Sequence, residues 1–341
     1  MRAAIVPAAL AGSLTLLWWR GPNWGQVGHA FTFAHWWWIV AALALNLLSV
    51  LARAIAWRTV IAQALPCPTP PFARVFSAFS IGLLANAVLP ARAGELARVA
   101  VLTRHLERGR GYTATLLGTV FAHRLFDVFP ATLLLVYVLL TAKIPDWAIT
   151  SLIIATGAAV LLLAGALAGS RTRRPATEEM RPVRRLVAMA RKGLDVLNSP
   201  FRAAVAILFQ CIGWFLQLLA VYVAMRAFGI HAPLPAAGLV LLLMNVATIF
   251  PLWPGNIGLL QAAVALPLRA YGVPYARGFA FGLGLQILEM SVGVGVGLIF
   301  LAREGISFAA LKRTAEPAPP VSTEVPAVQP DAERESARVP G

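Results

Sequence analysis

Long stretches of mostly apolar residues recur along this chain and restrict the folds open to it. Six of them are long enough to be membrane helices: 3–19, 36–57, 113–140, 147–169, 201–228 and 275–302. A helix needs about 20 predominantly apolar residues to cross the hydrocarbon core of a bilayer. One soluble core could not bury so many apolar segments. We therefore predict an all-α polytopic membrane protein with about six full spans.

The composition supports this class of protein. Of the 341 residues, 59% are hydrophobic and 13% are charged, whereas a soluble domain has roughly 25% charged residues. Tryptophans such as Trp18, Trp36 and Trp147 stand near the ends of the apolar stretches, which is where interfacial tryptophans collect.

The net charge of +15 would suggest a nucleic-acid partner in a soluble protein. Here the basic residues lie between apolar stretches, as they do in cytoplasmic loops, so we expect no nucleic acid. The segment 170–200 is the most basic loop, and helical spacing within it predicts an amphipathic helix on the cytoplasmic leaflet. We expect a multi-pass protein of the cell (inner) membrane with a cytoplasmic C-terminal tail.

Two further apolar stretches are too short or too interrupted to span. Residues 76–90 end at Pro90, and the stretch 235–269 is broken within 250–258 by two prolines and two glycines. A proline costs roughly 3 kcal/mol inside a helix, and non-helical backbone at membrane depth must be buried in protein or line water. We predict two re-entrant helical hairpins, one entering from each side, in inverted-topology repeats. Such interrupted pairs point to a transporter's binding site.

The chain divides into two parts. Residues 1–312 form the predicted transmembrane domain. Residues 313–341 are rich in Pro, Glu, Ala and Val without apolar periodicity, which predicts a disordered tail.

Charged residues follow the first break. Glu95 and Arg98 share a helix face because they are three residues apart, and Arg92 stands just before them. Guanidinium groups bind phosphate in a bidentate manner, and a helix starting near Ala93 would direct free N–H groups at an anion. The alternative is an interfacial cluster of arginines outside the membrane.

Two apolar stretches carry ionisable residues of their own. Arg124 and Asp127 lie in 113–140, and Glu289 lies in 275–302. Such residues inside a membrane face the protein interior and pair with something. Arg124 can contact Glu95 or a ligand beside it, or form a purely structural pair with Asp127. Glu289 is either functional or a hydrogen-bonded packing residue.

The second break supplies the tip of the second hairpin. Pro254, Gly255 and Gly258 belong to it, together with Pro251, and so many helix breakers exceed what a simple kink needs. Cys67 and Cys211 have no nearby cysteine or histidine ligand pattern. We expect no metal and no cofactor.

Three sequence blocks resemble the flippase-like membrane family that includes the transmembrane part of lysylphosphatidylglycerol synthase. They are Leu89-Pro-Ala-Arg-Ala-Gly-Glu-Leu-Ala-Arg98, Arg124-Leu-Phe-Asp127, and Pro251-Leu-Trp-Pro-Gly-Asn-Ile-Gly258. The resemblance covers about residues 5–305 and implies a multispan lipid-handling protein with re-entrant elements. The chain departs from the family pattern at His123, where a glutamate is usual, and at Gln261, where the family has a glutamate after the second tip.

These observations favour a lipid transporter or flippase, not an enzyme. It would move an anionic phospholipid or a lipid-linked glycan between leaflets. Arg92, Arg98 and Arg124 would hold the phosphate, and Glu95 and Asp127 would orient them. The alternatives are an enzyme that transfers a glycosyl or aminoacyl group to a lipid, and an accessory subunit of lipid biosynthesis. Besides the lipid, the partners left open are a second copy of the chain and a lipid-synthesis enzyme.

Overall fold

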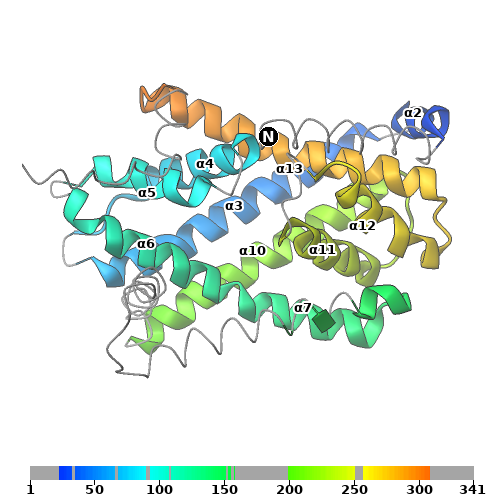
Figure 1. Ribbon diagram of the computed structural model, residues 1–341, viewed down its shortest axis with the longest axis horizontal. Coiled ribbons are helices and arrows are strands. Elements are labelled where there is room, and N and C mark those ends of the chain that lie inside the picture. The colour runs from blue at the N-terminus through cyan, green and yellow to red at the C-terminus, as the bar shows by residue number, and fades with distance from the viewer. Residues whose placement is uncertain are drawn as a thin grey trace, which may run out of the picture.

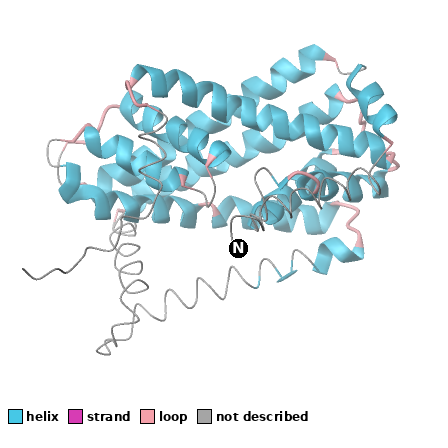
Figure 2. Cartoon of the chain, turned by 45° about the horizontal axis from the view of Figure 1, so that its top comes forward, coloured by secondary structure: helices cyan, strands magenta, loops and turns pink. Residues whose placement is uncertain are grey.

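The computed structural model describes residues 23–32, 35–65, 68–89, 93–106, 109–150, 153–154, 157, 199–249 and 256–307. Within these ranges every regular element is a helix (Figures 1 and 2). The prediction of an all-α polytopic protein is confirmed. The elements are α2 (Trp24–Thr32), α3 (Trp36–Ala64), α4 (Phe72–Val88), α5 (Gly94–Arg104), α6 (Gly109–Phe126), α7 (Val128–Thr141), α10 (Pro200–Ala227), α11 (Leu234–Ile249), α12 (Leu259–Leu268), the 3₁₀ helix η5 (Arg269–Tyr271) and α13 (Tyr275–Arg303).

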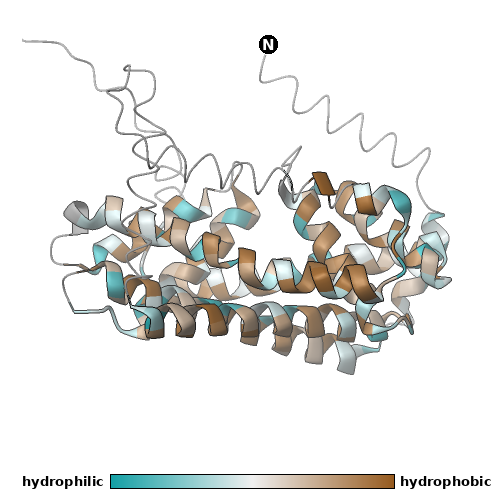
Figure 3. Cartoon of the chain, turned by 90° about the horizontal axis from the view of Figure 1, so that it is seen from below, coloured by the Kyte–Doolittle hydropathy of each residue, from teal (hydrophilic) through white to brown (hydrophobic). Residues whose placement is uncertain are grey.

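Four of the six predicted spans are present as long apolar helices: α3, the combined α6–α7 (Tyr112–Thr141), α10 and α13. They leave large apolar side chains exposed, for example Leu140 (79% exposed) and Phe201 (77%), as suits a surface that meets lipid. Figure 3 shows hydrophobic residues recurring along the helices of the described chain. The predicted span 3–19, most of 147–169, the segment 170–198 and the tail 313–341 lie outside the described residues.

The predicted continuous helix over 113–140 is broken at Asp127. The Asp127 N–H donates to the Arg124 carbonyl at 3.2 Å, which tightens the last turn of α6, and α7 starts at the next residue. The cause is Pro130 on the third residue of α7. Proline has no N–H to donate, and its ring clashes with the carbonyl four residues earlier, that of Phe126.

Two pairs of short helices form the predicted hairpins. One pair is α4 and α5, and the other is α11 and α12. Each of these helices has fewer residues than the about 20 that a bilayer crossing needs. In Figure 1 the first hairpin lies at one end of the long helices and the second at the opposite end.

The hairpins pack along α13 in opposite directions. Ser77 of α4 lies beside Glu304 at the end of α13, and Leu83 lies near Gly293, so α4 runs antiparallel to α13. On the second hairpin, α12 also runs antiparallel to α13, because Ala265 lies near Gly278 and Gln261 near Gly282. Since α4 enters the first hairpin and α12 leaves the second, the two hairpins point oppositely. The C-terminal end of α4 and the N-terminal end of α12 therefore both lie toward the middle of α13.

The same order of elements occurs twice in the described chain. A long helix, a hairpin and a second long helix follow one another as α3, α4–α5 and α6–α7, and again as α10, α11–α12 and α13. The helices α3 and α10 pack against each other at the centre, where the Ser49 hydroxyl donates to the Gly213 carbonyl at 2.7 Å. Each hairpin also contacts the last long helix of the other half, α4 on α13 and α11 on α7.

Candidate functional site

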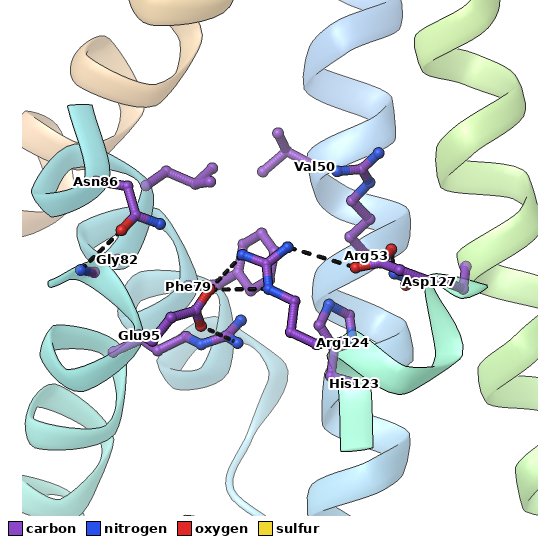
Figure 4. Close-up of a pocket in the computed structure, with 13 residues that line it drawn as sticks. Val50, Arg53, Phe79, Gly82, Asn86, Glu95, His123, Arg124 and Asp127 are labelled. Atoms are coloured by element: carbon purple, nitrogen blue, oxygen red, sulfur yellow. Dashed lines mark hydrogen bonds and ion pairs between the residues drawn. The ribbon is translucent and has the colours of Figure 1, made fainter. Parts of the chain in front are cut away.

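A small cavity lies between the first hairpin and the three long helices α3, α6 and α10. Its volume is about 60 Å³, which holds a few water molecules. Figure 4 shows charged side chains from different helices pointing into it. It is lined by Val50, Arg53, Phe79, Gly82, Leu83, Asn86, Gly94, Glu95, Arg98, His123, Arg124, Asp127 and Gln210.

Glu95 is the acidic centre of the cavity. One carboxylate oxygen accepts from Arg124 Nε at 2.9 Å and also from Nη2, while the other oxygen pairs with Arg98 Nη2. One carboxylate on α5 therefore holds an arginine of its own helix and an arginine of α6. Ion pairs of this kind in an apolar surrounding replace the water that the charges have lost.

Arg98 is the most deeply buried cation of the site, with 4% of its surface exposed. Its guanidinium lies over the Trp57 ring at 4.8 Å and near the Phe79 ring at 5.6 Å, so cation–π attraction adds to the ion pair. The Arg98 Nε–H is buried and has no hydrogen-bond partner among the described residues. An unpaired donor of a buried charged group is a ready contact for an anionic ligand.

Asp127 is held from three sides. Arg124 Nη1 lies 3.4 Å from one carboxylate oxygen, while the indole N–H of Trp214 donates to the other at 2.8 Å and Gln210 also donates to it. The turn between α6 and α7 places the aspartate where α10 can reach it. Arg124, half of whose side chain is exposed, bridges Glu95 and Asp127 as the outer wall of the cavity (Figure 4).

Arg53 connects the cavity to the second half of the molecule. It lies on α3, lines the cavity and donates through Nη2 to the Gln217 side-chain oxygen. Gln217 Nε2 in turn donates to Glu289 on α13 at 3.3 Å. A continuous chain of polar contacts thus leads from the charged cavity to the middle of α13.

A different contact occupies the start of α5. The Gly94 N–H donates to the Asn86 side-chain oxygen at 2.9 Å, and a Cβ added at Gly82 would stand 2.9 Å from the Gly94 carbonyl. Gly94 therefore has close neighbours on α4, and it also lines the cavity. This glycine lets α5 approach α4, and the first helix N–H is taken by Asn86.

The structure brings four predicted site residues into one cluster: Glu95, Arg98, Arg124 and Asp127. Gly258 starts α12 at the second tip, where its N–H donates to Gln261, and it does not line the cavity. Glu289 reaches the cluster only through Gln217 and Arg53. Arg92, Pro254 and Gly255 lie outside the described residues.

Sequence reasoning missed several cavity residues. They are Arg53, Asn86 and Gln210, with Trp214 beside them; His123, noted from the sequence only as a departure from the family pattern, also lines the cavity. Arg53 carried a usable signal, since an arginine inside an apolar span is by default a functional hypothesis. Asn86, Gln210 and Trp214 carried none, because such residues commonly serve as helix–helix hydrogen bonds or interfacial anchors.

The fold and the cavity define a multi-pass membrane protein with ion-paired charges among its apolar helices. The chain belongs to the family described as the lysylphosphatidylglycerol synthase TM region, whose model matches residues 4–314. This confirms the resemblance found in the three sequence blocks and associates the chain with lipid-related processes. No curated protein and no solved structure matches the chain.

Proposed function

We propose that this protein moves an anionic or glycosylated lipid between leaflets and that the charged cavity binds the lipid's phosphate. The observation that carries the proposal is the excess of guanidinium groups in the cavity. Among the described residues, three arginines, Arg53, Arg98 and Arg124, line it together with two carboxylates, Glu95 and Asp127. One singly charged phosphate would balance this set, and guanidinium is the side chain that best matches phosphate geometry.

Arg124 is the side chain that would open the site. The cavity is too small for a whole headgroup, and Arg124 forms its half-exposed outer wall. We expect a phosphate to displace Glu95 from Arg124 and to reach Arg98 behind it. Acyl chains would stay in lipid outside the helices while the headgroup passes between the leaflets. The two oppositely directed hairpins, which meet α13 from its two ends, would line that route.

The test is lipid movement in vesicles that contain the purified protein. Fluorescent phosphatidylglycerol in one leaflet should become accessible to a membrane-impermeant quencher faster than with empty vesicles. Arg98→Gln and Arg124→Gln should each slow this movement and weaken lipid binding. Each lost charge-assisted contact contributes on the order of 1.5–3 kcal/mol, or roughly 10- to 100-fold in affinity.

Arg303→Gln is the matched control. Arg303 is an exposed arginine in the last turn of α13 and contacts the Phe300 ring at 5.8 Å, away from the cavity. This variant should move lipid as the unaltered protein does. Equal rates for phosphatidylglycerol in all variants, or no movement above empty vesicles, would reject the proposal.

A further inference from the structure

Glu289 differs from the other membrane-embedded carboxylates in its partners. Glu95 and Asp127 each have an arginine within ion-pair distance, whereas Glu289 has none among the described residues. Among the described residues, its one hydrogen bond comes from the Gln217 side-chain amide at 3.3 Å. A carboxylate among apolar helices with so little compensation is the one that most easily takes up a proton.

The position of Glu289 in the repeat makes the comparison with Asp127 direct. Arg124 and Asp127 are three residues apart in the middle of α6–α7, and Gln286 and Glu289 are three apart in the middle of α13. The two long helices close the two halves of the fold. Glu289 therefore takes the place in the second half that Asp127 takes in the first, but glutamine replaces arginine beside it.

Counting charges links Glu289 to the cavity. Among the described residues, five charged side chains line the cavity, and Glu289 is joined to one of them, Arg53, through Gln217; the six are Arg53, Arg98, Arg124, Glu95, Asp127 and Glu289. With every carboxylate ionised, this set of three cations and three anions is neutral. A phosphate that enters the cavity adds one negative charge, and an uncompensated charge at membrane depth is strongly unfavourable. A proton bound at the same time restores neutrality.

We propose that Glu289 is a proton-binding site and that this protein takes up one proton with each anionic lipid it binds. This inference rests on the proposed function. The step is balanced: a phosphate anion and a proton enter, the Glu289 carboxylate becomes a carboxylic acid, and both are released together. When the proton leaves, the carboxylate is again compensated by Arg53, whose Nη2 already contacts Gln217 and whose Nε–H has no partner among the described residues.

Other titratable groups near this chain of contacts are few. Arg53 on α3 is the charged group that acts on Glu289, and Gln217 and Gln286 on α10 and α13 are neutral. His123 lines the cavity, but it lies among the three arginines, where a proton would add a fourth positive charge. Lipid movement with one proton would be electroneutral. A difference of one pH unit across the membrane would then support up to about a tenfold difference in lipid between leaflets.

The test is proton uptake during lipid binding. Short-chain phosphatidylglycerol is titrated into the full-length protein in weakly buffered detergent with a pH indicator, while binding is followed by native mass spectrometry. We expect one proton per bound lipid for the unaltered protein and none for Glu289→Gln, which should still bind the lipid. Glu304→Gln is the control on the same helix, because Glu304 pairs with His105 and Ser77 at the far end, and its uptake should stay at one.

The outcomes separate the two proposals. Binding without proton uptake, as would follow if another cation such as Arg92 balanced the phosphate, overturns this inference and leaves the proposed function standing. Uptake that persists in Glu289→Gln but disappears in His123→Asn also overturns it. No binding of the anionic lipid by any form of the protein rejects the proposed function, and this inference with it.

Discussion

The two hairpins have a similar shape and both pack on α13, but the polar contacts beside their tips differ in chemistry. Beside the first tip, Glu95 on α5 is joined by ion pairs to Arg98 and Arg124. Beside the second, Gln261 on α12 is joined by a neutral hydrogen bond to Gln286 at 2.6 Å. The arginines of the first contact carry charge that attracts an anion. The two amides of the second are neutral and join α12 to α13. The two halves therefore place polar groups at similar positions, but only the charged groups beside the first hairpin are suited to bind phosphate.

The sharpest way to break this comparison is to neutralise each anchor in turn. Glu95→Gln leaves two guanidinium groups without their shared carboxylate, and we expect it to destabilise the protein by about 3–5 kcal/mol. Gln261→Leu removes a fully buried amide and takes a hydrogen bond only from neutral partners. We expect it to lower the free energy of unfolding by about 1–3 kcal/mol. Thermal unfolding in detergent, with and without lipid, measures both. If the second variant were the less stable one, the proposed difference between the hairpins would be wrong.

A smaller effect tests how tightly the first hairpin closes. A Cβ at Gly82 would stand 2.9 Å from the Gly94 carbonyl and 3.0 Å from Arg98 Cβ. Gly82→Ala should therefore push α4 and α5 apart and lower the free energy of unfolding by about 1–3 kcal/mol. It should also displace Arg98 from the Trp57 and Phe79 rings. We expect a lower unfolding temperature together with changed Trp57 fluorescence.

Gly295→Ala on α13 is the matched control for that substitution. No described residue lies within 4 Å of a Cβ placed there, and alanine is favoured over glycine within a helix by roughly 0.5–1 kcal/mol. This variant should be as stable as the unaltered protein or more so. Equal losses in both variants would mean that the close contact between α4 and α5 is not what holds the hairpin.

Much of this organisation could be predicted because apolar length and helix breakers act locally. The four described long helices and both hairpins follow from segment length and from the prolines and glycines between segments. The break at Asp127 could also have been predicted, since Pro130 disrupts the hydrogen bonding of the preceding turn. The spacing of Glu95 and Arg98 placed them on one helix face, and the structure pairs them with each other.

The remaining features depend on contacts between distant segments. Nothing local indicates that Arg53 contacts Gln217, because 164 residues separate them, or that Trp214 donates to Asp127. In the same way, a glycine near a helix start permits close approach, but only the packed fold shows that Gly94 of α5 lies against Gly82 of α4. The distant connection from Glu95 to Glu289 appears only once α3, α10 and α13 are packed together.

The central claim is that the guanidinium groups of the first hairpin and α6 contact lipid phosphate. Solid-state NMR can measure this directly as dipolar coupling between lipid ³¹P and ¹⁵N-labelled arginine in membranes that contain the protein and phosphatidylglycerol. We predict clear coupling for the unaltered protein, the same coupling for Arg303→Gln, and its loss in the double variant Arg98→Gln/Arg124→Gln. Coupling that is absent in the unaltered protein, or that persists in the double variant, would contradict the account.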